Sequence, residues 1–145
     1  MNILFICKYN RFRSKVAEVY FKKINKNKNI KIKSAGIIKI NKSLDSLEKK
    51  RNIYLLKKFG FKLKARTKNV SVDLLLWADK IIIVADDVPK RLFDSKKWKN
   101  KLEFWKVADE NADKKPNIDK SVKTIINKTD KLVKKLEKKP WIQIQ

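Results

Sequence analysis

The chain has 145 residues, 43% of them hydrophobic, which suffices for one compact domain with a buried core. Lysine and arginine number 39 against 15 acidic residues, so the formal net charge is +24, and histidine is absent. The lack of histidine excludes a Ser-His-Asp triad, a Cys-His dyad and a histidine-ligated metal. The single cysteine excludes an internal disulfide and a clustered-cysteine zinc site.

The positive charge has two interpretations. It suits a nucleic acid, an anionic membrane surface or an acidic partner, but it also suits a surface on which lysine is the default residue. The lysines run from Lys8 to Lys139 without forming one patch, and arginine, the usual reader of base edges, is scarce. We therefore do not expect nucleic acid as the partner. No apolar run approaches a signal sequence or the ~20 residues of a membrane span, so a cytoplasmic, reduced protein is expected.

Apolar periodicity predicts alternating strands and helices along the whole chain. Strands are expected at 3–6, 30–33, 81–84 and 102–107. Helices are expected at about 15–24, 43–59, 72–76, 89–93 and 118–136, with Gly60 ending the second and Ser71 capping the third. In the third helix, Val72, Leu75 and Leu76 would share one apolar face. This order predicts an α/β three-layer sandwich, a parallel sheet flanked by helices, with residues 1–145 as a single domain.

Ligands of such sheets bind beyond the carboxyl ends of the strands. In this chain those ends carry Cys7, Ser34, Asp86 and Asp109. A thiol, a hydroxyl and two carboxylates are therefore expected on one edge of the sheet.

The segment from Cys7 to Ser14, which we call the Cys7 loop, joins the first strand to the first helix. Its backbone N–H groups, the Arg13 fork and the helix N-terminus would converge on an oxyanion above the sulfur. The binding residues expected from the loop are Lys8, Tyr9, Asn10, Arg11, Phe12 and Ser14. This arrangement predicts a phosphate site with a thiol beneath the phosphorus.

Such a site has an evident chemistry. The helix N-terminus and Arg13 favour a thiolate at Cys7, which would attack phosphorus and form a phosphocysteine that water hydrolyses. The leaving oxygen needs an acid and the water later needs a base, so without histidine a carboxylate must serve. Asp109 is the better-placed candidate, and Asp113 is the alternative.

The pattern Cys7-x5-Arg13-Ser14 at the N-terminus resembles the phosphate-binding loop of the low-molecular-weight protein tyrosine phosphatases, which share their fold with arsenate reductases. Further matches are Asn10 in the loop, Ala17-Glu18 in the first helix, Ser34-Ala35-Gly36 in the turn after the second strand, and Trp105-x-Val107-x-Asp109. The resemblance implies a four-stranded sheet in the order 2-1-3-4 and neither metal nor cofactor. It also implies roles: Cys7 as nucleophile, Arg13 as phosphate clamp, Ser14 as thiolate stabiliser, Asn10 as a strained left-handed residue and Ser34 as its support.

The sequence departs from the family pattern near the site. Tyr9 stands where many members have glycine, Phe12 replaces a second cysteine, and Asp109 is followed by glutamate instead of proline. The tyrosines that often flank the substrate ring are also missing. Tyr9, Phe12, Ile37 and Ile38 are candidates for a replacement apolar wall, although Phe12 and the isoleucines would equally suit core or loop packing.

The leading interpretation is a cysteine-dependent phosphomonoesterase of the protein tyrosine phosphatase type. Its substrate would be a phosphorylated protein or a small phosphomonoester, with inorganic phosphate as product and inhibitor. An arsenate reductase on the same scaffold would need an external thiol, because no resolving cysteine is present. A third interpretation is a non-catalytic protein that binds phosphate or an acidic partner.

Overall fold

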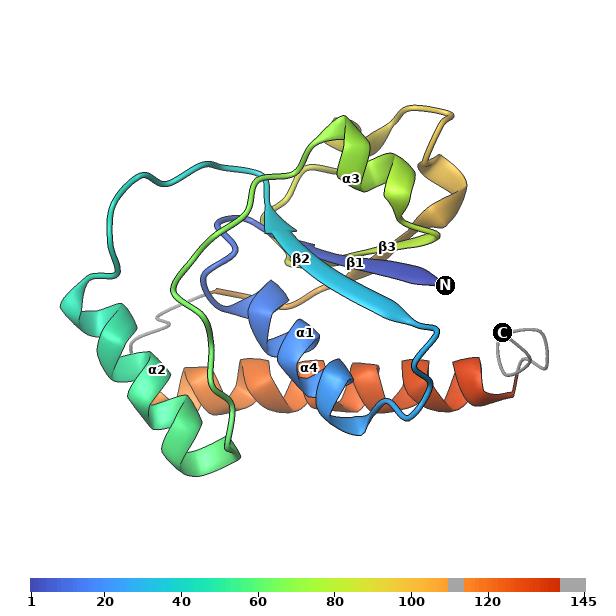
Figure 1. Ribbon diagram of the computed structural model, residues 1–145. Helices are drawn as coiled ribbons and strands as arrows, with labels where there is room; N and C mark the ends of the chain where they lie inside the picture. The colour runs from blue at the N-terminus through green and yellow to red at the C-terminus, as the bar shows by residue number, and fades with distance from the viewer. Residues whose placement is uncertain (110–113, 139–145) are drawn as a thin grey trace.

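The computed structural model describes residues 1–109 and 114–138 (Figure 1). The strands are β1 (Asn2–Cys7), β2 (Lys31–Gly36), β3 (Lys80–Val84) and β4 (Leu102–Trp105). The α-helices are α1 (Arg13–Ile24), α2 (Ser46–Phe59), α3 (Val72–Trp77) and α4 (Lys115–Glu137), and short 3-10 helices occupy Lys90–Phe93 and Lys99–Lys101. Asp113, the alternative candidate acid, lies outside the described residues.

The four strands form one sheet in the order β2-β1-β3-β4, and all three strand pairs are parallel. Phe5 in the central strand lies opposite Ser34 of β2 and Ile82 of β3. The predicted fold class and strand order are confirmed. Every connection leaves the sheet at its carboxyl edge, and this edge carries the Cys7 loop.

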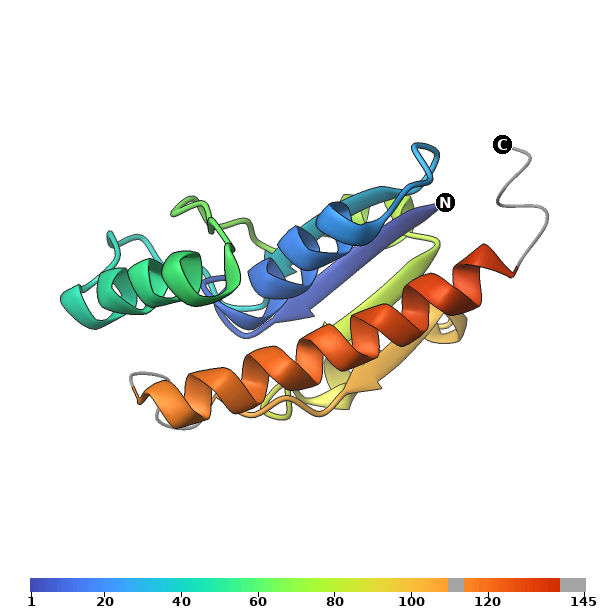
Figure 2. The same ribbon diagram turned by 90° about the horizontal axis from the view of Figure 1, so that it is seen from below.

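Helices α1 and α4 cover one face of the sheet (Figure 2), and side chains of the strands are buried on both faces. Ile3 and Phe5 of β1 pack with Ile82 and Val84 of β3 on the face that α1 and α4 cover. The intervening side chains of both strands pack on the other face, against α3 and the Lys90–Phe93 turn. Strands buried on both faces explain why these segments are continuously apolar in the sequence.

Two helix ends match the capping predictions. Ser71 Oγ accepts a hydrogen bond from the backbone N–H of Leu74 at 3.1 Å, and Gly60 ends α2 with φ of 74°. The predicted starts of two helices were wrong by two or three residues. α1 begins at Arg13, so Arg13 and Ser14 belong to its first turn, and α2 begins at Ser46 because Asp45 supplies the cap in a reciprocal capping box with Glu48.

Two further predictions were wrong. Ser34, Ala35 and Gly36 are the last residues of β2 instead of a turn after it, because all three pair with β1. In α3 only Leu75 is buried, while Val72 and Leu76 are 55% and 51% exposed. A six-residue helix turns less than twice, so one row of side chains reaches the sheet.

Within residues 1–109 and 114–138, no helix is both long enough and apolar enough to cross a bilayer.

Candidate active site

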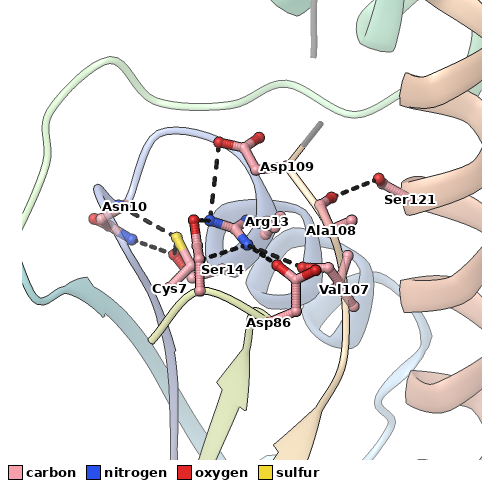
Figure 3. Close-up of polar contacts among 10 residues, drawn as sticks. Cys7, Asn10, Arg13, Ser14, Asp86, Val107, Ala108, Asp109 and Ser121 are labelled. Carbon is pink, nitrogen blue, oxygen red and sulfur yellow. Dashed lines mark hydrogen bonds and ion pairs between the residues drawn. The ribbon is translucent and has the colours of Figure 1, made fainter. Parts of the chain in front are cut away.

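The sulfur of Cys7 lies at the base of the loop, among polar groups (Figure 3). Cys7 is 2% exposed, and its Sγ lies 3.0 Å from Ser14 Oγ and accepts a hydrogen bond from the backbone N–H of Asn10 at 3.3 Å. The Asn10 amide donates to Ser14 Oγ at 2.8 Å. Since the oxygen of Ser14 already accepts from Asn10, its own proton is free to point at the sulfur. The sulfur thus has a hydroxyl and a backbone N–H directed at it.

Asn10 holds the loop in shape. It has φ of 55°, the one positive φ among the described non-glycine residues, and its side chain is buried. The amide nitrogen donates to Ser34 Oγ at 3.0 Å as well as to Ser14, and Oδ1 accepts from the backbone N–H of Lys68 at 3.0 Å. Ser34 in turn donates to Glu18 at 2.7 Å. Cys7, Asn10, Ser14, Ser34 and Glu18 thus form one connected set, which we call the floor network.

The end of β2 leaves room for this loop only because residue 36 is glycine. A Cβ on Gly36 would lie 2.7 Å from the carbonyl carbon of Tyr9 and 2.8 Å from the nitrogen of Asn10. Both atoms belong to the backbone and cannot rotate away. The glycine of the Ser34-Ala35-Gly36 motif therefore serves close packing between strand and loop.

Arg13 is 2% exposed and has several acceptors around its guanidinium. Nη1 donates to the carbonyl oxygen of Val107 at 2.9 Å and lies 3.0 Å from a carboxylate oxygen of Asp87. Asp86 and Asp109 lie 3.8 Å from the guanidinium, on different sides of it (Figure 3). These contacts fix the plane of the Arg13 fork next to the sulfur, as a bidentate oxyanion clamp requires.

Asp109 faces the same guanidinium from the end of the β4 segment. Burial raises the pKa of Asp109 above its ordinary value, against the lowering effect of Arg13 and Arg51, while Asp87 and Asp86 raise it further. Ser121 of α4 donates to the carbonyl oxygen of Ala108 at 3.0 Å and so fixes the backbone just before this carboxyl (Figure 3). A carboxyl with a raised pKa retains a proton to give away.

These groups border a cavity of about 410 Å³. Of the residues predicted to bind substrate, Tyr9, Arg11 and Phe12 line it, together with Cys7, Arg13 and Asp109. Asn10 and Ser14 lie beneath it in the floor network, and Lys8 lies outside it with Nζ 5.2 Å from the centre of the Tyr9 ring. Ile37 and Ile38, the candidates for an apolar wall, do not line the cavity: Ile37 packs beside the core under α3, and Ile38 is 41% exposed. Ile40 lines the cavity instead.

The remaining side of the cavity is formed by the N-terminal half of α2, which sequence reasoning missed. Arg11 donates to Glu48 at 2.7 Å and to the carbonyl oxygen of Lys42. Arg51, one turn after Glu48, lies with its guanidinium carbon 4.5 Å from the centre of the Phe12 ring. We call Arg11, Glu48 and Arg51 the α2 wall. In the sequence Arg51 ends a Lys-Lys-Arg run, which is typical of a solvated helix face, and only Leu55 four residues later hints at burial.

Within the described ranges, no group of three or more Cys, Asp or Glu side chains is placed to hold a metal ion.

Comparison with known proteins identifies the scaffold. The family model of the low molecular weight phosphotyrosine protein phosphatases matches residues 2–141. The chain belongs to this family. No curated protein matches the sequence. The resemblance noted from the Cys7 loop is thereby confirmed, as is the prediction of a cysteine-based phosphatase of the hydrolase class.

Solved structures of this scaffold cover nearly all of the chain. A low molecular weight phosphotyrosine phosphatase of Vibrio cholerae O395 has a TM-score of 0.79 at 21% identity, covering 95% of this chain and 97% of its own. The YwlE arginine phosphatase of Geobacillus stearothermophilus has a TM-score of 0.72 at 19% identity, covering 94% and 92%. An arsenate reductase of Archaeoglobus fulgidus has a TM-score of 0.63 at 25% identity, covering 90% and 98%. The fold is thus common to three activities.

Proposed function

We propose that residues 1–145 form a single catalytic domain that hydrolyses phosphomonoesters, with phosphotyrosine side chains of proteins as the principal substrates. Cys7 is the nucleophile, Arg13 holds the phosphoryl oxygens and Asp109 is the general acid. The observation that carries the proposal is the 3.0 Å contact between Ser14 Oγ and Cys7 Sγ, with Ser14 already accepting from Asn10. A structural cysteine would need no such donor.

In the first step the Cys7 thiolate attacks phosphorus, the S–P bond forms, and the bond from phosphorus to the leaving oxygen breaks. Asp109 gives its proton to that oxygen, so the leaving group departs as a neutral phenol or alcohol. The raised pKa of Asp109 supports this role, because it keeps the carboxyl protonated over a wider range of pH.

In the second step water attacks the phosphocysteine while the Asp109 carboxylate accepts its proton. The S–P bond breaks, inorganic phosphate leaves and the thiolate is regenerated. Arg13 supports both steps, because its planar fork matches the equatorial oxygens of the transferring phosphoryl group. The aromatic rings of Tyr9 and Phe12 on the cavity lining favour an aromatic leaving group.

The related activities supply the alternatives. Arsenate reduction would leave Cys7 to be regenerated by an external thiol, because the chain has no second cysteine. A phosphorylated guanidinium, the substrate class in the name of the YwlE relatives, would place a cation near Glu48, which Arg11 already occupies. Hydrolysis of an aromatic phosphomonoester requires neither an external thiol nor a second cation near Glu48.

The proposal is tested with purified protein and para-nitrophenyl phosphate, with Cys7→Ser as the paired variant. We expect hydrolysis with a mildly acidic optimum, abolished in Cys7→Ser, and phosphate binding by both proteins in calorimetry. Phosphate binding without turnover by the wild type would instead identify a non-catalytic binding protein. Arsenate-dependent consumption of an added thiol in the absence of hydrolysis would identify a reductase.

A further inference from the structure

Arg51 brings a third buried guanidinium to the active-site cavity, in addition to those of Arg11 and Arg13. Its side chain is 9% exposed and lines the same cavity as Cys7, Arg13 and Asp109. The guanidinium stacks on Phe12, a residue of the Cys7 loop. A cation is thus held beside the phosphate site by an element other than the loop.

Arg51 has no hydrogen-bond or ion-pair partner within residues 1–109 and 114–138. Its Nε belongs to a set of six buried side-chain nitrogen and oxygen atoms without a partner in those residues. Arg11 Nε and Asp109 Oδ1 belong to the same set, so three of the six come from residues that line this one cavity. Buried polar atoms are nearly always bonded in folded proteins, and such a concentration indicates a place where a ligand supplies the bonds.

Each described carboxylate near Arg51 has at least one oxygen in contact with another group. Glu48 accepts from Arg11 at 2.7 Å and from the backbone N–H of Asp45, and Asp45 caps α2 through the backbone N–H of Glu48. Asp109 faces Arg13. Burial lowers the pKa of Arg51, while the negative charges of Asp109, Glu48, Asp45 and Cys7 each raise it. The guanidinium is therefore desolvated and has no direct anion among residues 1–109 and 114–138.

We propose that Arg51 binds a carboxylate on the leaving group of the substrate, so that the preferred substrates are aromatic phosphomonoesters with an acidic group near the phosphate. This inference rests on the proposed phosphatase function and specifies its substrate class. A carboxylate matches the guanidinium in planarity and in unit charge. A second phosphate, with up to two charges, would meet stronger repulsion from Asp45 and Glu48.

The surroundings of the cavity agree with an acidic substrate. A neighbouring cavity of about 350 Å³ shares Arg11, Ile40 and Lys42 with the first, and Lys39 and Arg66 also line it. Its charged side chains are all positive. Acidic residues that flank a phosphorylated side chain would lie along these positive side chains, and the carboxylate nearest the phosphate would contact Arg51.

The test compares phenyl phosphate with its 2-, 3- and 4-carboxyl derivatives as substrates. We measure the ratio of kcat/KM on each carboxylated ester to kcat/KM on phenyl phosphate, so that general losses of activity cancel. Arg51→Met removes the charge and retains an unbranched apolar side chain over Phe12. Lys50→Met, from an exposed position on the same helix, removes the same charge and is the matched control.

We expect at least one carboxylated ester to be preferred by the wild type, and Arg51→Met to lower that ratio about tenfold, as for a lost hydrogen bond to a charged group. Lys50→Met should retain the preference. No preference in the wild type, or an unchanged preference in Arg51→Met, would overturn the inference while leaving the phosphatase intact. Arg51→Gln, which retains a polar side chain, provides the same comparison if Arg51→Met does not fold.

Failure of the proposed function is distinguishable. If the wild type hydrolyses none of the esters, calorimetry of the same compounds with Cys7→Ser and with Cys7→Ser/Arg51→Met measures binding alone. Tighter binding of a carboxylated ester that depends on Arg51 would support the carboxylate site without catalysis. Equal binding by both proteins would overturn it.

Discussion

The floor network and the α2 wall border the same cavity but differ in how many of their buried polar atoms have hydrogen-bond partners. In the floor network Asn10 uses its amide nitrogen twice and its oxygen once, and Ser34 both accepts and donates. In the α2 wall, the Nε atoms of Arg11 and Arg51 are buried without a partner among the described residues. The side chains of Asn10 and Ser34 in the floor network are hydrogen-bonded, whereas the α2 wall contains buried donors without an acceptor among the described residues.

The difference has an energetic meaning. A satisfied buried network is rigid and keeps the sulfur and its donors in one geometry before substrate arrives. A buried polar atom without a partner costs about 1–3 kcal/mol of stability, which a ligand that bonds to it restores. The floor therefore suits the chemistry common to all substrates, and the wall suits the choice among them.

The largest expected effect comes from changing Arg13, the phosphate clamp, which adjoins both the floor network and the α2 wall. Arg13→Lys should lower kcat/KM on para-nitrophenyl phosphate by about 10³-fold, because lysine cannot bind two phosphoryl oxygens in a plane. Steady-state kinetics checks this, with Arg91→Lys, an exposed arginine of the Lys90–Phe93 turn, as the control. A loss below tenfold would show that the loop backbone holds the phosphate without the clamp.

Asp109→Asn should lower kcat by about 10²-fold, because the leaving oxygen loses its acid. Asp109 acts in its protonated form, so wild-type kcat should fall as pH rises through its raised pKa, and this fall should vanish in the variant. The free energy of unfolding should rise in this variant although kcat falls. Since the folded chain disfavours the Asp109 carboxylate, the variant should be more stable than the wild type at neutral pH, as urea denaturation would measure. An unchanged kcat would move the acid assignment to Asp113.

Asn10→Ala, in the floor network, should destabilise the fold by about 2 kcal/mol, because Ser14, Ser34 and the Lys68 N–H lose a partner at once. Urea denaturation measures the loss. Asn10→Gly separates conformation from hydrogen bonding, since glycine accepts the positive φ without strain. If Asn10→Gly is as stable as the wild type, the amide bonds contribute little and the floor is less rigid than its contacts indicate.

The smallest effect is expected at a hydrogen bond that belongs to neither region. Tyr20 of α1 donates to Asp130 of α4 at 2.6 Å, and Tyr20→Phe should cost about 1 kcal/mol of stability without changing selectivity among esters. Burial and Asp130 raise the pKa of Tyr20 to about 12. Its contribution is therefore complete below about pH 10 and is lost as pH rises toward 12, so wild type and Tyr20→Phe should converge in stability there.

The sequence was sufficient for the sheet, and the family resemblance pointed to Cys7, Asn10, Ser14 and Ser34 of the floor network, although not to the bond between Ser34 and Glu18. Continuous apolar runs such as 81–84 indicate strands buried on both faces, and the Cys7-x5-Arg13-Ser14 spacing places a thiol, a guanidinium and a hydroxyl on one turn of chain. Both signals are local. The capping residues Ser71 and Gly60 were found for the same reason, because a cap bonds to its own helix.

The α2 wall could not be predicted, because its geometry depends on contacts far apart in the chain. Arg51 packs on Phe12, 39 positions earlier, and nothing in the Lys-Lys-Arg run separates the buried cation from the exposed ones. The acceptor of Arg13 at Val107 is likewise a backbone carbonyl, which carries no side-chain signal. The same holds for Lys68, whose backbone N–H bonds to Asn10.

Glu48 contacts the Cys7 loop and the start of α2 through one oxygen. Its Oε1 accepts from Arg11 at 2.7 Å and from the backbone N–H of Asp45 at 3.1 Å. This one side chain therefore links the Cys7 loop to the helix that carries Arg51. Glu48→Asp, one methylene shorter, would draw the helix and the loop together or break their link, so the shape of the cavity depends on the length of one side chain that lines it.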